Sequence, residues 1–113
     1  MNQLNAKMNI HKKHSANDIR HLALVTAARS GNGKAQSQLM EHYKDAVFYM
    51  LLKMVNNKAE AEELSVKAFE NAFTNIHLCN PEYPISIWLF RIASNNAIEH
   101  LREKRAMVRS QKI

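Results

Sequence analysis

The sequence has few of the residues that form turns or crosslinks. Its 113 residues include two glycines, two prolines and one cysteine, Cys79. Because tight hairpins need turn residues of this kind, their scarcity argues against a β-sheet, and the abundant Ala, Leu, Lys, Glu and Met favour long helices. A lone cysteine forms no internal disulfide, so nothing in the sequence requires an oxidising compartment. The sequence therefore predicts an all-α fold and a cytoplasmic location.

Long apolar runs are also missing. No segment approaches the roughly 20 apolar residues of a membrane span, and the polar start, MNQLNAKMNIHKKH, lacks the apolar stretch of a signal peptide. We therefore expect neither membrane insertion nor export. The length, with 46% hydrophobic and 23% charged residues, predicts one globular domain.

Patterns that indicate catalysis or metal binding are absent as well. The six histidines are scattered, there is no H-E-x-x-H motif or glycine-rich phosphate loop, and Cys79 has no partner motif for nucleophilic chemistry. No pair of metal-ligating residues has a motif spacing with a second pair to complete four ligands. We expect no enzymatic activity, no catalytic residues, no metal and no cofactor.

The charge is unevenly distributed along the chain. A net charge of +6 and a pI near 9.7 favour a polyanionic partner, most often nucleic acid. Basic residues gather near the two ends, and acidic residues gather in one central segment. The positions are His11 to His14, Arg102, Lys104, Arg105, Arg109 and Lys112 for the basic groups, and Glu60, Glu62, Glu63 and Glu70 for the acidic group. Such a molecule can hold DNA with one end and a protein with the acidic patch.

Apolar spacing predicts three helices in the first two thirds of the chain. The first starts at Ser15 or Asn17 and stops before Gly31, the second starts at Asn32 or Gly33, and the third is capped by Asn57. The first helix runs through Ile19, Leu22, Ala23, Thr26 and Ala27, and the 3, 4 spacing of the second is kept by Leu39, Tyr43, Ala46, Val47, Met50, Leu51 and Met54. The residues expected on the buried side of the third are Ala61, Leu64, Ser65, Ala68, Phe69, Ala72 and Ile76.

A fourth helix is predicted from about Ser86 into the basic tail, after a loop over residues 77–85 that contains both prolines. We expect a flexible basic arm over 1–15, a helical domain over 16–107 and a basic tail over 108–113. One face of the fourth helix is expected to be core, with Leu89, Phe90, Ala93, Ala97, His100 and Leu101, and the other carries Trp88, Arg91, Asn95, Glu99 and Arg102.

The second face of this helix has two interpretations. In one, Trp88 tucks back into the core and the polar residues face water, which helix geometry alone favours. In the other, Trp88 stacks on bases and the arginines bind phosphates, as in proteins that bind single-stranded nucleic acid.

Two sequence blocks resemble a known family. The block WLFRIASNNAIEHLR, Trp88 to Arg102, resembles the promoter-melting and minus-10 segment in region 2 of bacterial RNA polymerase sigma factors of the extracytoplasmic-function group. The block AEAEELSVKAF, Ala59 to Phe69, is similar to the polymerase-binding helix of that region, and the spacing between the blocks also fits. The resemblance covers roughly Asp18 to Arg105 and implies a three- to four-helix bundle.

The resemblance implies two partners, the RNA polymerase core and promoter DNA. The acidic helix would dock on the clamp helices of the largest polymerase subunit, and the loop before the fourth helix would capture a flipped base from the non-template single strand of the minus-10 element. The implied polymerase-binding residues are Glu60, Glu62, Glu63, Val66 and Lys67. The implied DNA-binding residues are Asn80, Tyr83, Trp88, Arg91, Asn95, Asn96, Arg102 and Arg105, with Glu82 beside the base pocket.

The sequence departs from the family pattern at several positions. Val66 and Lys67 stand where the family often has Gln and an acidic residue, the lead-in to Trp88 lacks a basic residue, and Ser94 stands where many members have Arg. No second domain for the minus-35 element follows, so the chain is either a fragment of a longer factor or a single-domain relative. Two alternatives stay open: an interaction module without promoter activity, held by an anti-sigma factor, and a general basic DNA-binding protein.

Overall fold

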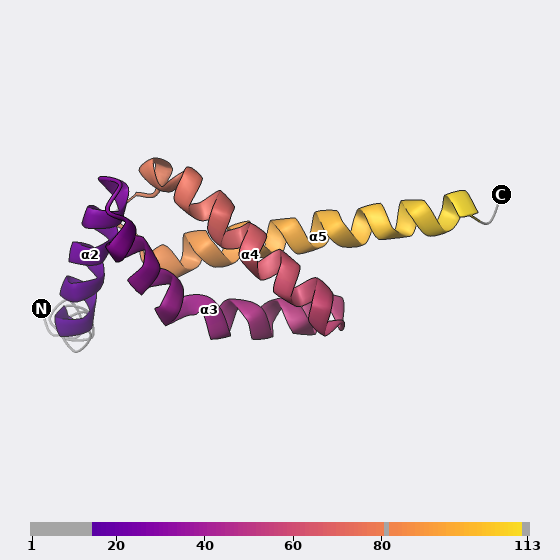
Figure 1. Ribbon diagram of the computed structural model, residues 1–113, viewed down its shortest axis with the longest axis horizontal. Helices are drawn as coiled ribbons and strands as arrows, with labels where there is room; N and C mark the ends of the chain where they lie inside the picture. The colour runs from indigo at the N-terminus through magenta and orange to yellow at the C-terminus, as the bar shows by residue number, and fades with distance from the viewer. Residues whose placement is uncertain (1–14, 81, 112–113) are drawn as a thin grey trace, which may run out of the picture.

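The computed structural model describes residues 15–80 and 82–111, and these residues form helices joined by short connections (Figure 1). The elements in chain order are α2 (Ser15–Arg29), α3 (Gly33–Val55), α4 (Lys58–Thr74), the 3-10 helix η1 (Ile76–Leu78) and α5 (Ile85–Gln111). The predicted all-α bundle is confirmed. The predicted basic arm lies outside the described residues, apart from Ser15, which begins α2.

The break between α2 and α3 forms where glycine was expected to stop the helix. Gly31 has φ of +91°, a conformation that costs glycine little. Its N–H donates to the carbonyl of Ala28 at 3.0 Å, and the N–H of Asn32 donates to the carbonyl of Ala27 at 3.1 Å. This pair of bonds is a Schellman motif, which satisfies the last carbonyls of α2. The Asn32 side chain then caps α3 by accepting from the N–H of Ala35.

Two consecutive asparagines make the turn between α3 and α4. Asn56 adopts the left-handed conformation, with φ of +53°, and its N–H donates to the carbonyl of Leu52 at 2.8 Å. Asn57 is extended, and its side chain accepts from the N–H of Glu60 at 3.0 Å, which caps α4 as predicted. One residue closes a helix and the next opens another, so α3 and α4 are close neighbours.

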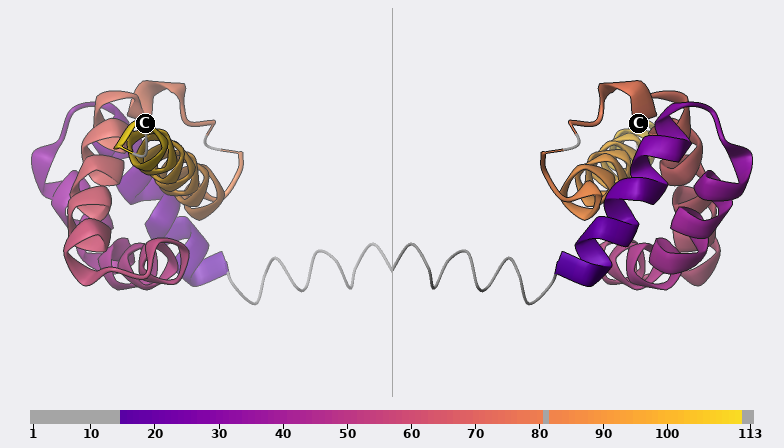
Figure 2. Two further views of the ribbon diagram at one scale, coloured as in Figure 1. Left: turned by 90° about the vertical axis from the view of Figure 1, so that its right-hand side faces the viewer. Right: turned by 90° about the vertical axis from the view of Figure 1, so that its left-hand side faces the viewer.

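The core consists of two clusters that share helices α3 and α5. The larger one lies among α3, α4 and α5 and includes the fully buried Val47 and Leu51; the smaller one joins α2, the start of α3, η1 and the start of α5. Helix α3 packs against α2, α4 and α5. Seen end-on, α5 lies alongside the other helices, and its C-terminal end points out of the bundle (Figure 2).

The residues whose spacing predicted α2 are mostly outside its buried face, although Ala27 packs against the smaller core cluster. Leu22 is 47% exposed, and Ala23 and Thr26 are also exposed, whereas Val25 and Ala28 are buried. The cause is that apolar residues surround this helix on nearly every side, so spacing alone does not choose between faces. Packing against α3 and η1 chooses the face with Val25 and Ala28.

Helix α5 has a packed half and a projecting half. Ile85, Leu89, Ala93 and Ala97 are buried, whereas every residue from 102 to 111 is exposed. The projecting half extends beyond the other helices in Figure 1. The helix is continuous to Gln111, so the residues predicted as a separate tail from 108 onward are helical up to that point. None of the described helices has the length and apolarity needed to cross a membrane.

Candidate nucleic-acid and protein interfaces

The loop before α5 contains the buried Cys79, and its other described residues, which include Asn80 and Tyr83, are exposed. Cys79 is 2% exposed, and this burial raises the pKa of its thiol. The N–H of Glu82 donates to the side-chain oxygen of Asn80 at 3.0 Å, and the N–H of Tyr83 donates to the backbone carbonyl of Asn80 at 3.1 Å. This turn uses the Asn80 side-chain oxygen as an acceptor, so the side-chain group that remains for other hydrogen bonds is the amide nitrogen, a donor. Tyr83 is 65% exposed, so a ring face is accessible for stacking.

The predicted DNA-binding residues divide into six exposed and two half-buried side chains. The exposed ones are Asn80, Tyr83, Arg91, Asn95, Arg102 and Arg105. Trp88 is half-buried and packs against both core clusters, so part of its side chain faces the core as one of the two interpretations expected, and its role in DNA binding stays a prediction. Asn96 is also half-buried, and its amide nitrogen is buried without a hydrogen-bond partner among the described residues.

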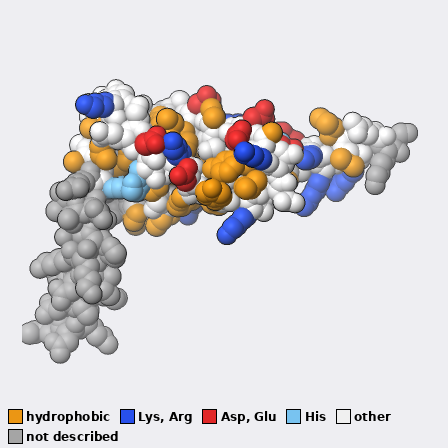
Figure 3. Space-filling view, turned by 60° about the horizontal axis from the view of Figure 1, so that its bottom comes forward, with side chains coloured by type: hydrophobic (Ala, Val, Ile, Leu, Met, Phe, Trp, Pro, Cys, Tyr) orange, Lys and Arg blue, Asp and Glu red, His pale blue; other side chains and the backbone are white. Residues whose placement is uncertain are grey.

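The outward side of α5 carries a stripe of arginines. At about 100° per residue, Arg91, Asn95, Arg102 and Arg105 fall within about 40° of one line along the helix, and Arg109 continues it. We call these five residues the arginine stripe. It is about 27 Å long at 1.5 Å per residue. Arg109 was counted in the basic tail but missed as part of this face, although the same helical spacing identifies it. Lys and Arg side chains line the projecting end of the molecule in Figure 3.

The acidic helix α4 turns most of its predicted polymerase-binding residues to the surface. Glu62, Glu63, Val66 and Lys67 are exposed, and Val66 is 60% exposed although it is apolar. An exposed apolar side chain among charges is typical of a contact surface, although a single one is weak support. The predicted polymerase-binding glutamates therefore lie on α4 and the arginines on α5, although α4 also carries Lys58 and Lys67 and α5 also carries Glu99 and Glu103.

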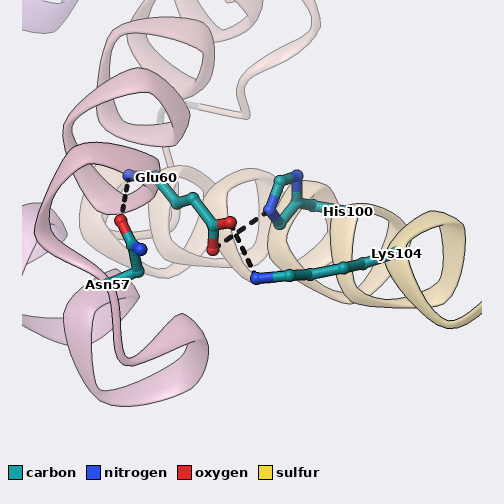
Figure 4. A network of polar contacts seen from close by, with 4 residues as sticks. All are labelled: Asn57, Glu60, His100 and Lys104. Atoms are coloured by element: carbon teal, nitrogen blue, oxygen red, sulfur yellow. Dashed lines mark hydrogen bonds and ion pairs between the residues drawn. The ribbon is translucent and has the colours of Figure 1, made fainter. Parts of the chain in front are cut away.

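Glu60 differs from the other four residues of this set because its carboxylate turns toward α5 (Figure 4). Its Oε1 lies 2.8 Å from Lys104 Nζ, and its Oε2 lies 3.4 Å from His100 Nε2. The Lys104 hydrogen bond, with a smaller contribution from His100, lowers the pKa of the Glu60 carboxyl despite partial burial. We call Glu60, His100 and Lys104 the α4–α5 clasp. No sequence pattern predicts this clasp, because 44 residues separate Glu60 from Lys104.

The exposed side chains of the loop before α5, of the arginine stripe and of α4 can bind other molecules by stacking, hydrogen bonding and charge. Among residues 15–80 and 82–111, no three His, Cys, Asp or Glu side chains are grouped so that they could hold a metal ion. The surfaces offer stacking by Tyr83, hydrogen bonding by Asn80 and Asn95, and charge from the arginine stripe and from α4. Stacking combined with positive charge is the chemistry that holds single-stranded nucleic acid.

Comparison with known proteins gives consistent matches. Residues 39–107 match the family described as Sigma-70 region 2. The chain is 31% identical to the ECF RNA polymerase sigma factor SigW of Bacillus subtilis, over 72% of this chain and 43% of that protein. It is 29% identical to the ECF RNA polymerase sigma factor BldN of Streptomyces coelicolor, over 80% of this chain and 34% of that protein. The chain thus spans less than half the length of these curated relatives.

A solved structure shares the fold. The NMR structure of an engineered region 2 of sigmaE, in complex with GTAAAA, superposes with a TM-score of 0.70 and 25% sequence identity. The superposition covers 74% of this chain and 87% of that one. The similarity therefore extends through most of the helical bundle.

Proposed function

Because the chain belongs to the Sigma-70 region 2 family, as an extracytoplasmic-function type of that region, we propose that it binds core RNA polymerase and the promoter minus-10 element during transcription initiation. In this proposal α4 docks on the clamp helices of the largest polymerase subunit. The loop at Asn80 to Tyr83 and the arginine stripe of α5 bind the non-template single strand. No chemical step is assigned to the chain.

The DNA part of the proposal is carried by the match to a region 2 structure that was solved with GTAAAA. In this chain the exposed Tyr83 ring and the Asn80 amide lie in the loop immediately before α5. A base extruded from a duplex costs a few kcal/mol of stacking and pairing, and stacking on an aromatic ring offsets part of that cost. Arginines on the adjoining helix face supply phosphate contacts.

The polymerase part of the proposal is supported by the exposed side of α4. Glu62, Glu63 and Lys67 present charge around the exposed apolar side chain of Val66. Partially apolar surfaces with a charged rim are the usual composition of protein interfaces. Because α4 and the arginine stripe are separate elements, both partners can bind the chain together.

Fluorescence anisotropy tests the DNA part. A labelled single strand containing GTAAAA, its duplex and a scrambled strand are titrated with the chain at low salt, alone and with core polymerase. We expect the GTAAAA single strand to bind most tightly. Arg102→Ala with Arg105→Ala weakens binding to every sequence and flattens the salt dependence by about 0.7 per lost phosphate contact. Equal affinity for all three DNAs would favour the general basic DNA-binding protein instead.

A second candidate function follows from Val66 and Lys67, which depart from the family pattern on the docking surface and leave an apolar side chain 60% exposed. In this alternative the chain is an interaction module whose α4 surface binds an anti-sigma partner and not polymerase. A pull-down with purified core polymerase separates the two. Recovery of the chain at stoichiometric amounts supports the sigma function, and its absence supports the interaction module.

A further inference from the structure

The α4–α5 clasp lies where α5 leaves the bundle. Leu101 is the last residue of α5 that packs against the larger core cluster, and the residues after it are exposed. Lys104, three residues further on, reaches back to the first turn of α4 through Glu60. Among the described residues this is the last hydrogen bond or ion pair between the projecting half of α5 and another helix.

The Glu60 carboxylate of the clasp is more enclosed than the carboxylates of the other ion pairs of the described chain, whereas the Lys104 side chain is 52% exposed, close to the 49% of Lys44. The Glu60 side chain is 22% exposed and that of His100 is 29% exposed, whereas the Glu41 and Glu99 carboxylates in pairs within one helix are 70% and 58% exposed. Glu60 Oε2 and His100 Nε2 are both buried from water and lie 3.4 Å apart, and neither atom has a hydrogen-bond partner among the described residues. Because only the carboxylate side of the Glu60–Lys104 pair is enclosed, solvent screens the pair slightly less than a pair with two exposed partners, and its contribution stays near that of one surface pair.

Glu60 occupies a position from which a carboxylate often bonds within its own helix. It is the third residue after the N-cap Asn57, where a Glu side chain commonly returns to the N-cap N–H in a capping box. Here the carboxylate lies against Lys104 and His100 of α5 (Figure 4). The Glu60 carboxylate therefore contacts a second helix and is not directed to the N-cap N–H of its own helix.

The clasp also separates the charges of α5. Lys104 is about 140° around the helix from Arg91, at about 100° per residue, so it lies away from the arginine stripe. Glu60 pairs with this one lysine, and Arg105 and Arg109 remain exposed on the stripe. If the helix beyond Leu101 rotated or frayed, Lys104 and the distal arginines of the stripe would no longer lie on different sides of α5.

We propose that Glu60 is a positioning residue: through Lys104 and His100 it keeps the first free turns of α5 helical and holds the distal part of the arginine stripe, Arg102 to Arg109, in register with Arg91. The inference rests on the proposed function, because the stripe is the phosphate-binding surface of that proposal. It assigns Glu60 to the organisation of the DNA-binding helix, apart from Glu62 and Glu63 on the outward side of α4.

Amide hydrogen exchange on the whole chain tests the clasp without any partner. The variants are Glu60→Gln, Lys104→Gln and the charge swap E60K/K104E, with Glu70→Gln as the control because Glu70 is an exposed carboxylate on the same helix. We expect Glu60→Gln and Lys104→Gln to speed exchange over residues 102–108 by about two- to fivefold, the effect of losing one ion pair. E60K/K104E should restore protection, and Glu70→Gln should leave it unchanged.

DNA affinity gives the second measurement. We expect Glu60→Gln to weaken binding of the GTAAAA single strand about two- to fivefold, and E60K/K104E to recover most of that loss, since the pair is rebuilt with reversed charges. Unchanged exchange in Glu60→Gln, or no rescue by the swap, would overturn the inference. If the parent chain binds neither polymerase nor single-stranded DNA while exchange responds as expected, the proposed function fails and the clasp remains as a structural contact only.

Discussion

Helices α4 and α5 are built alike on their buried sides and differ on their exposed sides. Each buries small residues where it meets its neighbours, Ala61, Ala68 and Ala72 in α4 and Ala93 and Ala97 in α5. Small side chains let two helices approach closely, and the two helices pack against each other and against α3. The exposed side of α4 is rich in glutamate, whereas the exposed side of α5 carries the arginine stripe.

The buried residues of α4 and α5 specify the fold, whereas their exposed residues specify the partners in the proposed function. Buried residues of either helix serve the same core, so a core substitution in one helix disturbs both surfaces. Exposed residues serve one partner each in the proposed function, so a substitution there disturbs one kind of binding and leaves stability within about 0.5 kcal/mol. The predictions below test this separation in order of decreasing effect.

The largest effect is expected from the core of α4. Leu64 is 5% exposed within the larger cluster, and Leu64→Ala should lower the free energy of unfolding by about 2 to 5 kcal/mol because it leaves a cavity. Urea denaturation measures the change. The control is Val66→Ala, two residues on and 60% exposed, which should change stability by less than about 0.5 kcal/mol. Similar losses in the two variants would mean that α4 does not have one buried and one exposed side.

The burial of Leu64 was predictable because α4 has a regular pattern. Its apolar residues recur at three- and four-residue intervals, and its flanking asparagines mark the start, so both the helix and its face follow from the sequence. Helix α2 shows the opposite case. Its apolar residues surround the helix, and only the contact with α3 and η1 determines that Val25 and Ala28 are buried.

The candidate surfaces were predictable to a similar degree. The exposure of Tyr83, Arg91 and Glu63 follows from loop position and helical spacing. The clasp at Glu60 was not predictable, because it depends on how two helices distant in sequence cross and on which side chains are long enough to meet there. Trp88 is a related case: it faces outward by helical angle, but the neighbouring clusters extend far enough to bury part of its side chain.

The next effect concerns recognition of a base by the loop. Tyr83→Ala should reduce discrimination between GTAAAA and a scrambled single strand by about 1 to 3 kcal/mol, because a stacking surface is lost. Tyr49 is a matched control, since it is an exposed tyrosine, at 60% against 65% for Tyr83, on α3. Tyr49→Ala should leave the discrimination unchanged in the same anisotropy titration. Equal effects of the two substitutions would remove the loop from the proposed recognition site.

A comparable test applies to the exposed side of α4. Val66→Asp and Glu63→Lys should each weaken binding to core polymerase by about tenfold, or about 1.4 kcal/mol, while the affinity for single-stranded DNA at low salt stays within twofold for Val66→Asp. The reason is that the substituted side chains lie on the surface of α4, away from the arginine stripe. Biolayer interferometry with immobilised polymerase measures the first quantity. Polymerase binding that is unaffected by both substitutions would remove α4 from the docking role.

The smallest effect is expected from the clasp, and it should depend on pH. Lys104, followed by His100, lowers the pKa of the Glu60 carboxyl in the folded chain below its ordinary value. A carboxyl whose pKa is lower in the folded state stabilises the fold at pH values above its unfolded pKa, and this contribution is lost as the pH falls through the folded pKa. Glu60→Gln should therefore have a lower urea midpoint than the parent at pH 7 and at pH 6, and this difference in midpoint should disappear below about pH 4.

Glu70→Gln is the control, because its carboxylate is exposed on the same helix, and its urea midpoint should not differ from that of the parent in this way. A gap between Glu60→Gln and the parent that stays constant from pH 7 to pH 3 would show that the charge of Glu60 does not hold α4 and α5 together.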